Sequence, residues 1–84
     1  MIKVSSVKVY PDYILLVSFS TGENKYFDMK PYLHYPVFLK LTNPDFFALA
    51  SVAYDTVIWP GDIDIAPETL YAQGIVIDIN EANF

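Results

Sequence analysis

The candidate binding groups of this chain are concentrated between Trp59 and Tyr71, in the stretch WPGDIDIAPETLY. Asp62 and Asp64 are separated by one residue, so on an extended segment both carboxylates project to the same side. Glu68 follows on the predicted helix, and three such carboxylates can bind a hard cation. The candidate binding residues are therefore Trp59, Asp62, Asp64, Glu68 and Tyr71.

A structural role explains the same acids and is the interpretation we favour. Calcium loops supply six to eight oxygens from a patterned loop, and the spacing of an EF-hand is missing here. Asp62 would instead shape a turn at Gly61. Asp64 would help to cap a helix that begins at Pro67, and Glu68 would complement the positive end of its dipole. We predict no cofactor and no metal.

The chain offers no recognisable catalytic group. Carboxylate pairs in glycoside hydrolases need a sugar-sized cleft, and a domain of 84 residues has little volume for one. His34 is the only histidine and has no acidic neighbour in the local sequence, which favours a structural role over a general base or metal ligand. The serines lack the context of a nucleophile elbow. We therefore predict that the protein is not an enzyme.

Trp59, the only tryptophan, adjoins Pro60 at the end of a predicted strand. Trp is frequent among the residues that dominate protein interfaces. In so small a domain, however, closing the core is the favoured role. The alternative, an anchor for a partner, stays open.

The charge of the chain is acidic and free of arginine. Ten acidic residues face five lysines, which gives a net charge of -5. Nucleic-acid binders need Lys and Arg clustered on one face, and anionic membranes attract similar clusters. Here the lysines are scattered singly, so we predict neither direct nucleic-acid binding nor membrane recruitment. The negative field favours a basic protein partner.

No cysteine is present, which excludes disulfides, thiol catalysis and zinc-thiolate sites. The first ten residues alternate like a strand and lack the apolar core of a signal peptide. No apolar run approaches the roughly 20 residues of a membrane-spanning helix. A cytoplasmic location is the expectation.

The N-terminal part predicts three antiparallel strands in a meander. The first strand, residues 2–9, changes phase near Ser5 and Ser6, which indicates a bulge. The second, residues 13–19, is apolar on both faces and belongs in the middle of a sheet. Residues 25–29 form the third. The connecting turns are expected at residues 10–13 and 20–24, with Gly22 available for positive φ.

Two short helices are expected next. One begins at Pro36 and places Val37, Phe38 and Leu41 on one side. The other begins at residues 43–45, an Asn-Pro-Asp sequence in which the Asn side chain can cap free N–H groups.

Residues 50–59 predict a hairpin of short strands that turns at Asp55, with a longer helix through Ala53 as the alternative. Residues 67–73 predict a helix that ends at Gly74 in a left-handed conformation.

Residues 75–79 alternate and are rich in β-branched side chains, which predicts a last strand. Its three isoleucines could pair with another chain, and Asp78 would discourage uncontrolled pairing. The whole chain is expected to form a single α+β domain over residues 1–84. Its small antiparallel meander is followed by short helices, a short hairpin and a C-terminal strand.

Four motifs in this order resemble the prokaryotic family DUF2442, a domain of unknown function. The motifs are the Phe19–Glu23 turn, the Phe27-Asp28 pair before Pro31–Leu33, the Leu41–Phe47 stretch and the Trp59–Tyr71 block. The family-like core spans residues 1–73, and the strand in residues 74–84 is extra. Pro60 and Gly61 stand where the family more usually has an Asn-Gly pair after the Trp.

The resemblance implies a small α+β domain and does not imply an enzyme. Some members carry a helix-turn-helix domain after this module, and standalone members are often encoded beside another small protein, which suggests toxin-antitoxin pairing. Because this chain ends at Phe84, any DNA role would need a partner.

We therefore expect a non-catalytic protein-interaction module, antitoxin-like or regulatory, that binds a protein partner or itself. The alternative is a small-ligand or divalent-metal-binding domain that uses the acids of the Trp59–Tyr71 block.

Overall fold

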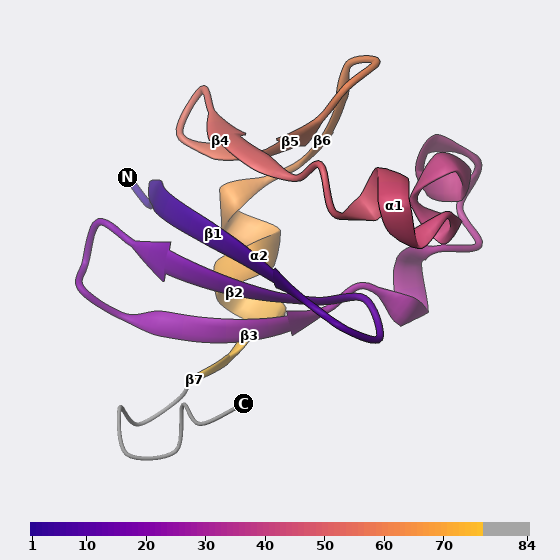
Figure 1. The fold of residues 1–84 in the computed structure, drawn as a ribbon. Coiled ribbons are helices and arrows are strands. Elements are labelled where there is room, and N and C mark those ends of the chain that lie inside the picture. Colours follow the sequence, from indigo (N-terminus) through magenta and orange to yellow (C-terminus); the bar gives the residue numbers. More distant parts are fainter. Residues whose placement is uncertain (77–84) are drawn as a thin grey trace.

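The computed structural model describes residues 1–76 and shows two antiparallel sheets joined by short helices (Figure 1). The first sheet has the strand order β1-β2-β3-β7, and the second has the order β4-β5-β6. This confirms the α+β class predicted from the sequence. The strands are β1 (Val4–Tyr10), β2 (Ile14–Phe19), β3 (Asn24–Asp28), β4 (Ser51–Ala53), β5 (Thr56–Trp59), β6 (Ile63–Ile65) and β7 (Ile75–Val76). The 3-10 helices are η1 (Lys30–Tyr32) and η2 (Pro36–Thr42), and the α-helices are α1 (Pro44–Phe47) and α2 (Pro67–Gln73).

The meander forms as the sequence predicts. The β1–β2 register shifts between Val4 and Ser6, which confirms the bulge. Strand β2 lies between β1 and β3, in agreement with its apolar character on both faces. Leu15 and Val17 are fully buried on its inner face. Gly22 has a φ of 92°, as the tight turn before β3 requires.

The predicted hairpin is part of a larger sheet. Strands β4 and β5 pair around Tyr54 and Asp55, which confirms the turn and excludes the longer helix through Ala53. Strand β6 then pairs with β5, after a turn at residues 60–62. The sequence analysis missed β6 because only three residues pair in it, too few for a period of two to stand out.

The sequence predicts the cap of α1 correctly but places one side chain of η2 wrongly. Asn43 caps α1, since its side-chain oxygen accepts a hydrogen bond of 2.9 Å from the Asp45 N–H, as predicted. Helix η2 buries Phe38 and Leu41 but leaves Val37 57% exposed, so the predicted position of Val37 is wrong. A 3-10 helix has three residues per turn, which aligns positions 38 and 41 and turns position 37 away.

Helix α2 covers residues 67–73 as predicted, but its N-terminus is not capped as predicted. Its N-cap is Ala66, and no side chain caps the helix there. The predicted role of Asp64 is therefore wrong. Asp64 belongs to β6, and a residue held in a strand is not free to reach the helix N–H groups.

Gly74 ends α2 with a φ of -72°, so the predicted left-handed conformation is also wrong. Space explains the glycine instead. A Cβ at this position would lie 2.6 Å from the Leu70 carbonyl oxygen and 3.0 Å from the Lys25 Cβ. The chain can pass this close to β3 only without a side chain.

Strand β7 then pairs antiparallel with β3, so Ile75 and Val76 confirm the start of the predicted last strand. The rest of that strand, residues 77–79 with Asp78, lies outside the described residues.

The core lies between the sheets, and α2 crosses one face of the first sheet (Figure 1). The Val4 N–H donates to the Asp55 carbonyl oxygen across 2.8 Å and links β1 to the β4–β5 turn. None of the helices among residues 1–76 has the length and apolar character to cross a bilayer. The buried apolar side chains are Val4, Leu15, Val17, Phe19, Phe27, Met29, Phe38, Leu41, Phe47, Val57, Trp59, Ile63, Ile65 and Leu70.

Candidate functional site

Trp59, the first of the predicted binding residues, is a core residue. Only 2% of it is exposed. Its indole N–H donates a hydrogen bond of 2.9 Å to the Phe47 carbonyl oxygen, and the two rings lie 5.9 Å apart. The side chain therefore joins β5 to α1 and contributes to the fold.

Tyr71 fastens α2 to the first sheet. Its hydroxyl donates to the Glu23 carboxylate across 2.5 Å, and its ring meets Phe19 edge-on at 5.2 Å. The buried Lys25 ammonium donates to the Tyr71 carbonyl oxygen across 2.5 Å and lies 3.6 Å from the centre of its ring. The Tyr71 hydrogen bond, helped by Thr21, lowers the pKa of Glu23, and the same bond to Glu23 raises the pKa of Tyr71.

Glu68 is exposed on the first turn of α2. Within residues 1–76, no three His, Cys, Asp or Glu side chains are grouped so that they could hold a metal ion. The structure thus does not assemble Asp62, Asp64 and Glu68 into one cation site.

Asp62 and Asp64 do border one depression, Asp62 from the β5–β6 turn and Asp64 from the outer face of the second sheet. In the β5–β6 register Asp64 lies opposite Ile58, and Ile58 lies opposite Ser51 of β4. A shallow depression of about 340 Å³ is lined by Ile58, Asp62 and Asp64, together with Tyr54 at the β4–β5 turn. We call Tyr54, Ile58, Asp62 and Asp64 the acidic face.

The two acids of this face were predicted as binding residues from the sequence, whereas Tyr54 and Ile58 were not. A signal for Ile58 was present, because it alternates with Val57 and Trp59 and so points to the opposite side of β5. Its partners across the sheet became known only with the register of β6.

Tyr54 is held in an unfavourable conformation without any compensating contact. Its φ is 53°, that of Asp55 is 63°, and 92% of Tyr54 is exposed. A bulky residue in the left-handed region costs about 1–3 kcal/mol. The two-residue hairpin turn favours Asn or Gly at such positions. Neither the backbone nor packing therefore explains a tyrosine here.

The two acids of the face are unpaired. Both ion pairs among residues 1–76 are made by Lys30, and neither involves Asp62 or Asp64. A cation does approach the edge of the face, since the Lys40 ammonium lies 3.8 Å from the position that a Cβ on Gly61 would take. Lys40 makes no ion pair with either acid.

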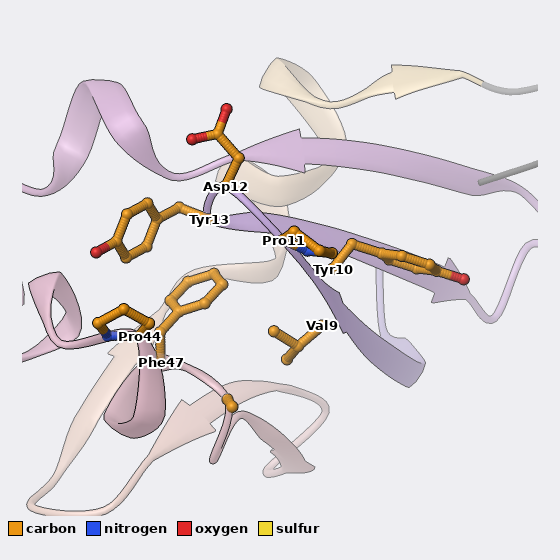
Figure 2. Close-up of a pocket in the computed structure, with 8 residues that line it drawn as sticks. Val9, Tyr10, Pro11, Asp12, Tyr13, Pro44 and Phe47 are labelled. Atoms are coloured by element: carbon orange, nitrogen blue, oxygen red, sulfur yellow. The ribbon is translucent and has the colours of Figure 1, made fainter.

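A second depression, of about 440 Å³, lies between the β1–β2 turn and α1 (Figure 2). Its aromatic walls are already used by the fold, because Tyr13 meets Phe47 edge-on at 5.3 Å and donates its hydroxyl to the Thr42 carbonyl oxygen. Its carboxylate, Asp12, pairs with Lys30 at 3.1 Å. The acidic face is the candidate site because its aromatic ring and carboxylates have no such partners.

His34 is exposed and does not line either depression, and its ring lies 4.3 Å from that of Tyr35. The structural role favoured from the sequence stays a prediction.

The family model described as "Protein of unknown function (DUF2442)" matches residues 4–76. The match includes β7 and so reaches slightly beyond the family-like core expected from the motifs. No curated protein and no solved structure matches the chain. The match covers most of the 84 residues, and the chain belongs to the DUF2442 family.

Proposed function

We propose that this protein is a non-catalytic interaction module that binds a basic protein partner through the acidic face. The observation that carries the proposal is Tyr54, which is 92% exposed and has a φ of 53°. Residues kept in a strained conformation without packing are typical of functional sites. Tyr is also among the residue types that dominate binding energy at interfaces.

The surroundings of Tyr54 suit a protein surface. Ile58 supplies apolar area beside the ring, and the unpaired carboxylates of Asp62 and Asp64 border it. An apolar centre with a charged rim is the usual anatomy of an interface. The depression is open and shallow, which suits a protruding side chain of a partner better than a substrate that must be enclosed.

The charge of the chain indicates a basic partner. The net charge is -5 and no arginine is present. Complementary charge steers association and suppresses wrong partners. We further propose that this partner is the second protein of a two-protein system, in which the present chain is the antitoxin-like or regulatory member. This part rests on what the family resemblance implies, that standalone members are often encoded beside another small protein.

Co-expression with the protein encoded next to this chain tests the proposal. We expect a stable complex in size-exclusion chromatography with light scattering. Replacing Tyr54 and Ile58 together by Ser should weaken the complex at least tenfold, about 1.4 kcal/mol. Val37→Ser is the matched control, because Val37 is exposed and apolar but lies on η2. A monomer that forms no complex, or equal losses in both variants, would contradict the proposal.

The same depression favours a second candidate, a site for a small ligand or divalent metal ion at Asp62 and Asp64. Trp59 also lines the depression, so its fluorescence should respond to an occupant. Titration with Ca²⁺, Mg²⁺ and Mn²⁺ tests the metal version. A flat response at millimolar metal would remove it.

A further inference from the structure

We infer that the acidic face recognises an arginine side chain of the partner, with Tyr54 as the stacking surface and Asp64 as the carboxylate that binds the guanidinium. This inference rests on the proposed function and specifies which chemical group the face selects. It follows from the placement of the two residues, their lack of partners and the difference between arginine and lysine.

The sheet register fixes the geometry of the face. Asp64 and Ile58 are directly opposite each other on β6 and β5, so their side chains share the outer side of the sheet. Ile63 and Ile65, the neighbours of Asp64, are buried on the inner side. Asp64 is therefore held in place by a strand whose other side is packed in the core. Tyr54 borders the same depression.

The charge on the face is not satisfied from within the protein. Among residues 1–76, Asp12 and Asp28 both pair with Lys30, whereas Asp62 and Asp64 have neither an ion pair nor a side-chain hydrogen bond. The chain contains no arginine at all. A guanidinium on this face must come from another molecule.

Arginine fits the face better than lysine does. Its planar guanidinium binds a carboxylate through two parallel hydrogen bonds and also stacks on an aromatic ring. It is less strongly hydrated than an ammonium, so it loses less on leaving water. A lysine ammonium can also lie over an aromatic ring, as Lys25 does over Tyr71, but it is not planar and cannot stack on Tyr54 while making two parallel hydrogen bonds to one carboxylate. Lys40 already offers an ammonium near Gly61 and pairs with neither acid.

Short peptides test the inference without the natural partner. The probes are acetyl-Leu-Arg-Leu-amide and the same peptide with Lys or citrulline in place of Arg. Citrulline keeps the shape of arginine and removes its charge. Binding is followed through the amide resonances of isotope-labelled protein at low salt. We expect saturable shifts at Tyr54, Ile58 and Asp64, with the Arg peptide binding at least fivefold more tightly than the Lys peptide. The citrulline peptide should give no saturable shift.

Two variants and one control sharpen the test. Tyr54→Leu and Asp64→Asn should each weaken the Arg peptide at least fivefold, and Tyr54→Leu should also remove its advantage over Lys. Asp45→Asn is the control, because it makes the same change in net charge on α1. Unchanged amide spectra of the free variants establish that they fold. Equal affinity for the Arg and Lys peptides, or equal losses in Asp64→Asn and Asp45→Asn, would overturn the inference.

The test also separates this inference from the function on which it rests. If the natural partner binds through Tyr54 and Ile58 while the peptides show no preference for Arg, the recognition of arginine is wrong and the interaction module remains. If the Arg peptide binds but the double Ser variant keeps the natural partner, the assigned interface is wrong.

Discussion

The β1–β2 and β4–β5 turns place the same two residue types, Asp and Tyr, in the left-handed conformation. At the first turn Asp12 and Tyr13 have φ values of 68° and 63°. At the second, Tyr54 and Asp55 have φ values of 53° and 63°. Both turns therefore carry a comparable conformational cost.

The two turns differ in what offsets that cost. The ring of Tyr13 packs on Phe47 (Figure 2), and its hydroxyl is hydrogen-bonded. Lys30 binds both the carbonyl oxygen and the carboxylate of Asp12. Tyr54 has no such contact and is 92% exposed. Tertiary contacts therefore offset the strain at the first turn, whereas no contact within the folded protein offsets the strain at Tyr54.

The largest loss of folding stability is expected for Tyr13→Ala. Alanine in the same left-handed conformation keeps the strain and loses the aromatic contact, the hydroxyl hydrogen bond and the buried area, which together stabilise by about 2–4 kcal/mol. Urea denaturation measures this difference. Tyr54→Ala, the matched change at the other turn, should stay within about 0.5 kcal/mol. Equal losses at the two turns would remove the contrast between them.

A smaller loss of folding stability is expected for Lys30→Met, which removes the cation from the β1–β2 turn. The hydrogen bonds to Asp12 and then Asp28 raise the pKa of Lys30. A raised pKa means stability that is present below the ordinary lysine value and is lost as the pH rises through the value in the folded state. The difference between wild type and variant should therefore be constant near neutral pH and shrink above about pH 10.5. Denaturation curves from pH 7 to 11 test this, and Lys8→Met on the exposed side of β1 should show no such trend.

Tyr54→Asn should change stability in the opposite direction. Asparagine tolerates the left-handed region, so we expect the variant to be more stable by about 0.5–1 kcal/mol. The same variant should bind the partner less well, because the exposed ring is gone. Thermal unfolding and the binding measurement are made on one preparation. A loss of stability would show that Tyr54 contributes to the fold, which contradicts its assignment to an interface.

The smallest effect concerns Tyr71, the predicted site residue that the fold uses. Its hydrogen bond lowers the pKa of Glu23 below 4.5, so the resulting stability is present above pH 4.5 and is lost as the pH falls through the folded-state value. The raised pKa of Tyr71 gives stability that is present below pH 10.0 and lost above it. Tyr71→Phe should thus be less stable than wild type at neutral pH, and the difference should shrink toward both pH extremes. A difference independent of pH would contradict this assignment.

Much of the fold could be predicted from the sequence because local signals agree with it. Alternating apolar residues defined the meander, Asn43 marked the start of α1, and Pro67 marked that of α2. The wrong position of Val37 and the missed strand β6 also have local causes. Val37 was misplaced by the difference between a 3-10 and an α-helix, and β6 was too short for its period to be seen.

The candidate site was only half predictable, because residues near in sequence were separated by the fold. The Trp59–Tyr71 block divides into a core residue, Trp59, two acids that border the depression at the second sheet, and a tyrosine fixed to the first sheet. The β5–β6 turn and strand β6 lie between Trp59 and Tyr71. Residues that are close in sequence therefore end on different surfaces of the fold.

The sequence by itself determined the α+β class, the DUF2442 family, the acidic charge and the absence of arginine, because these depend on composition and local pattern. Only the tertiary structure decided which residues are exposed and which are paired. The pairing of β6 with β5 brings Asp64 beside Ile58, and the tight β4–β5 turn presents Tyr54 next to them. Strand register and burial are long-range properties, and they depend on contacts that no short stretch of the chain contains.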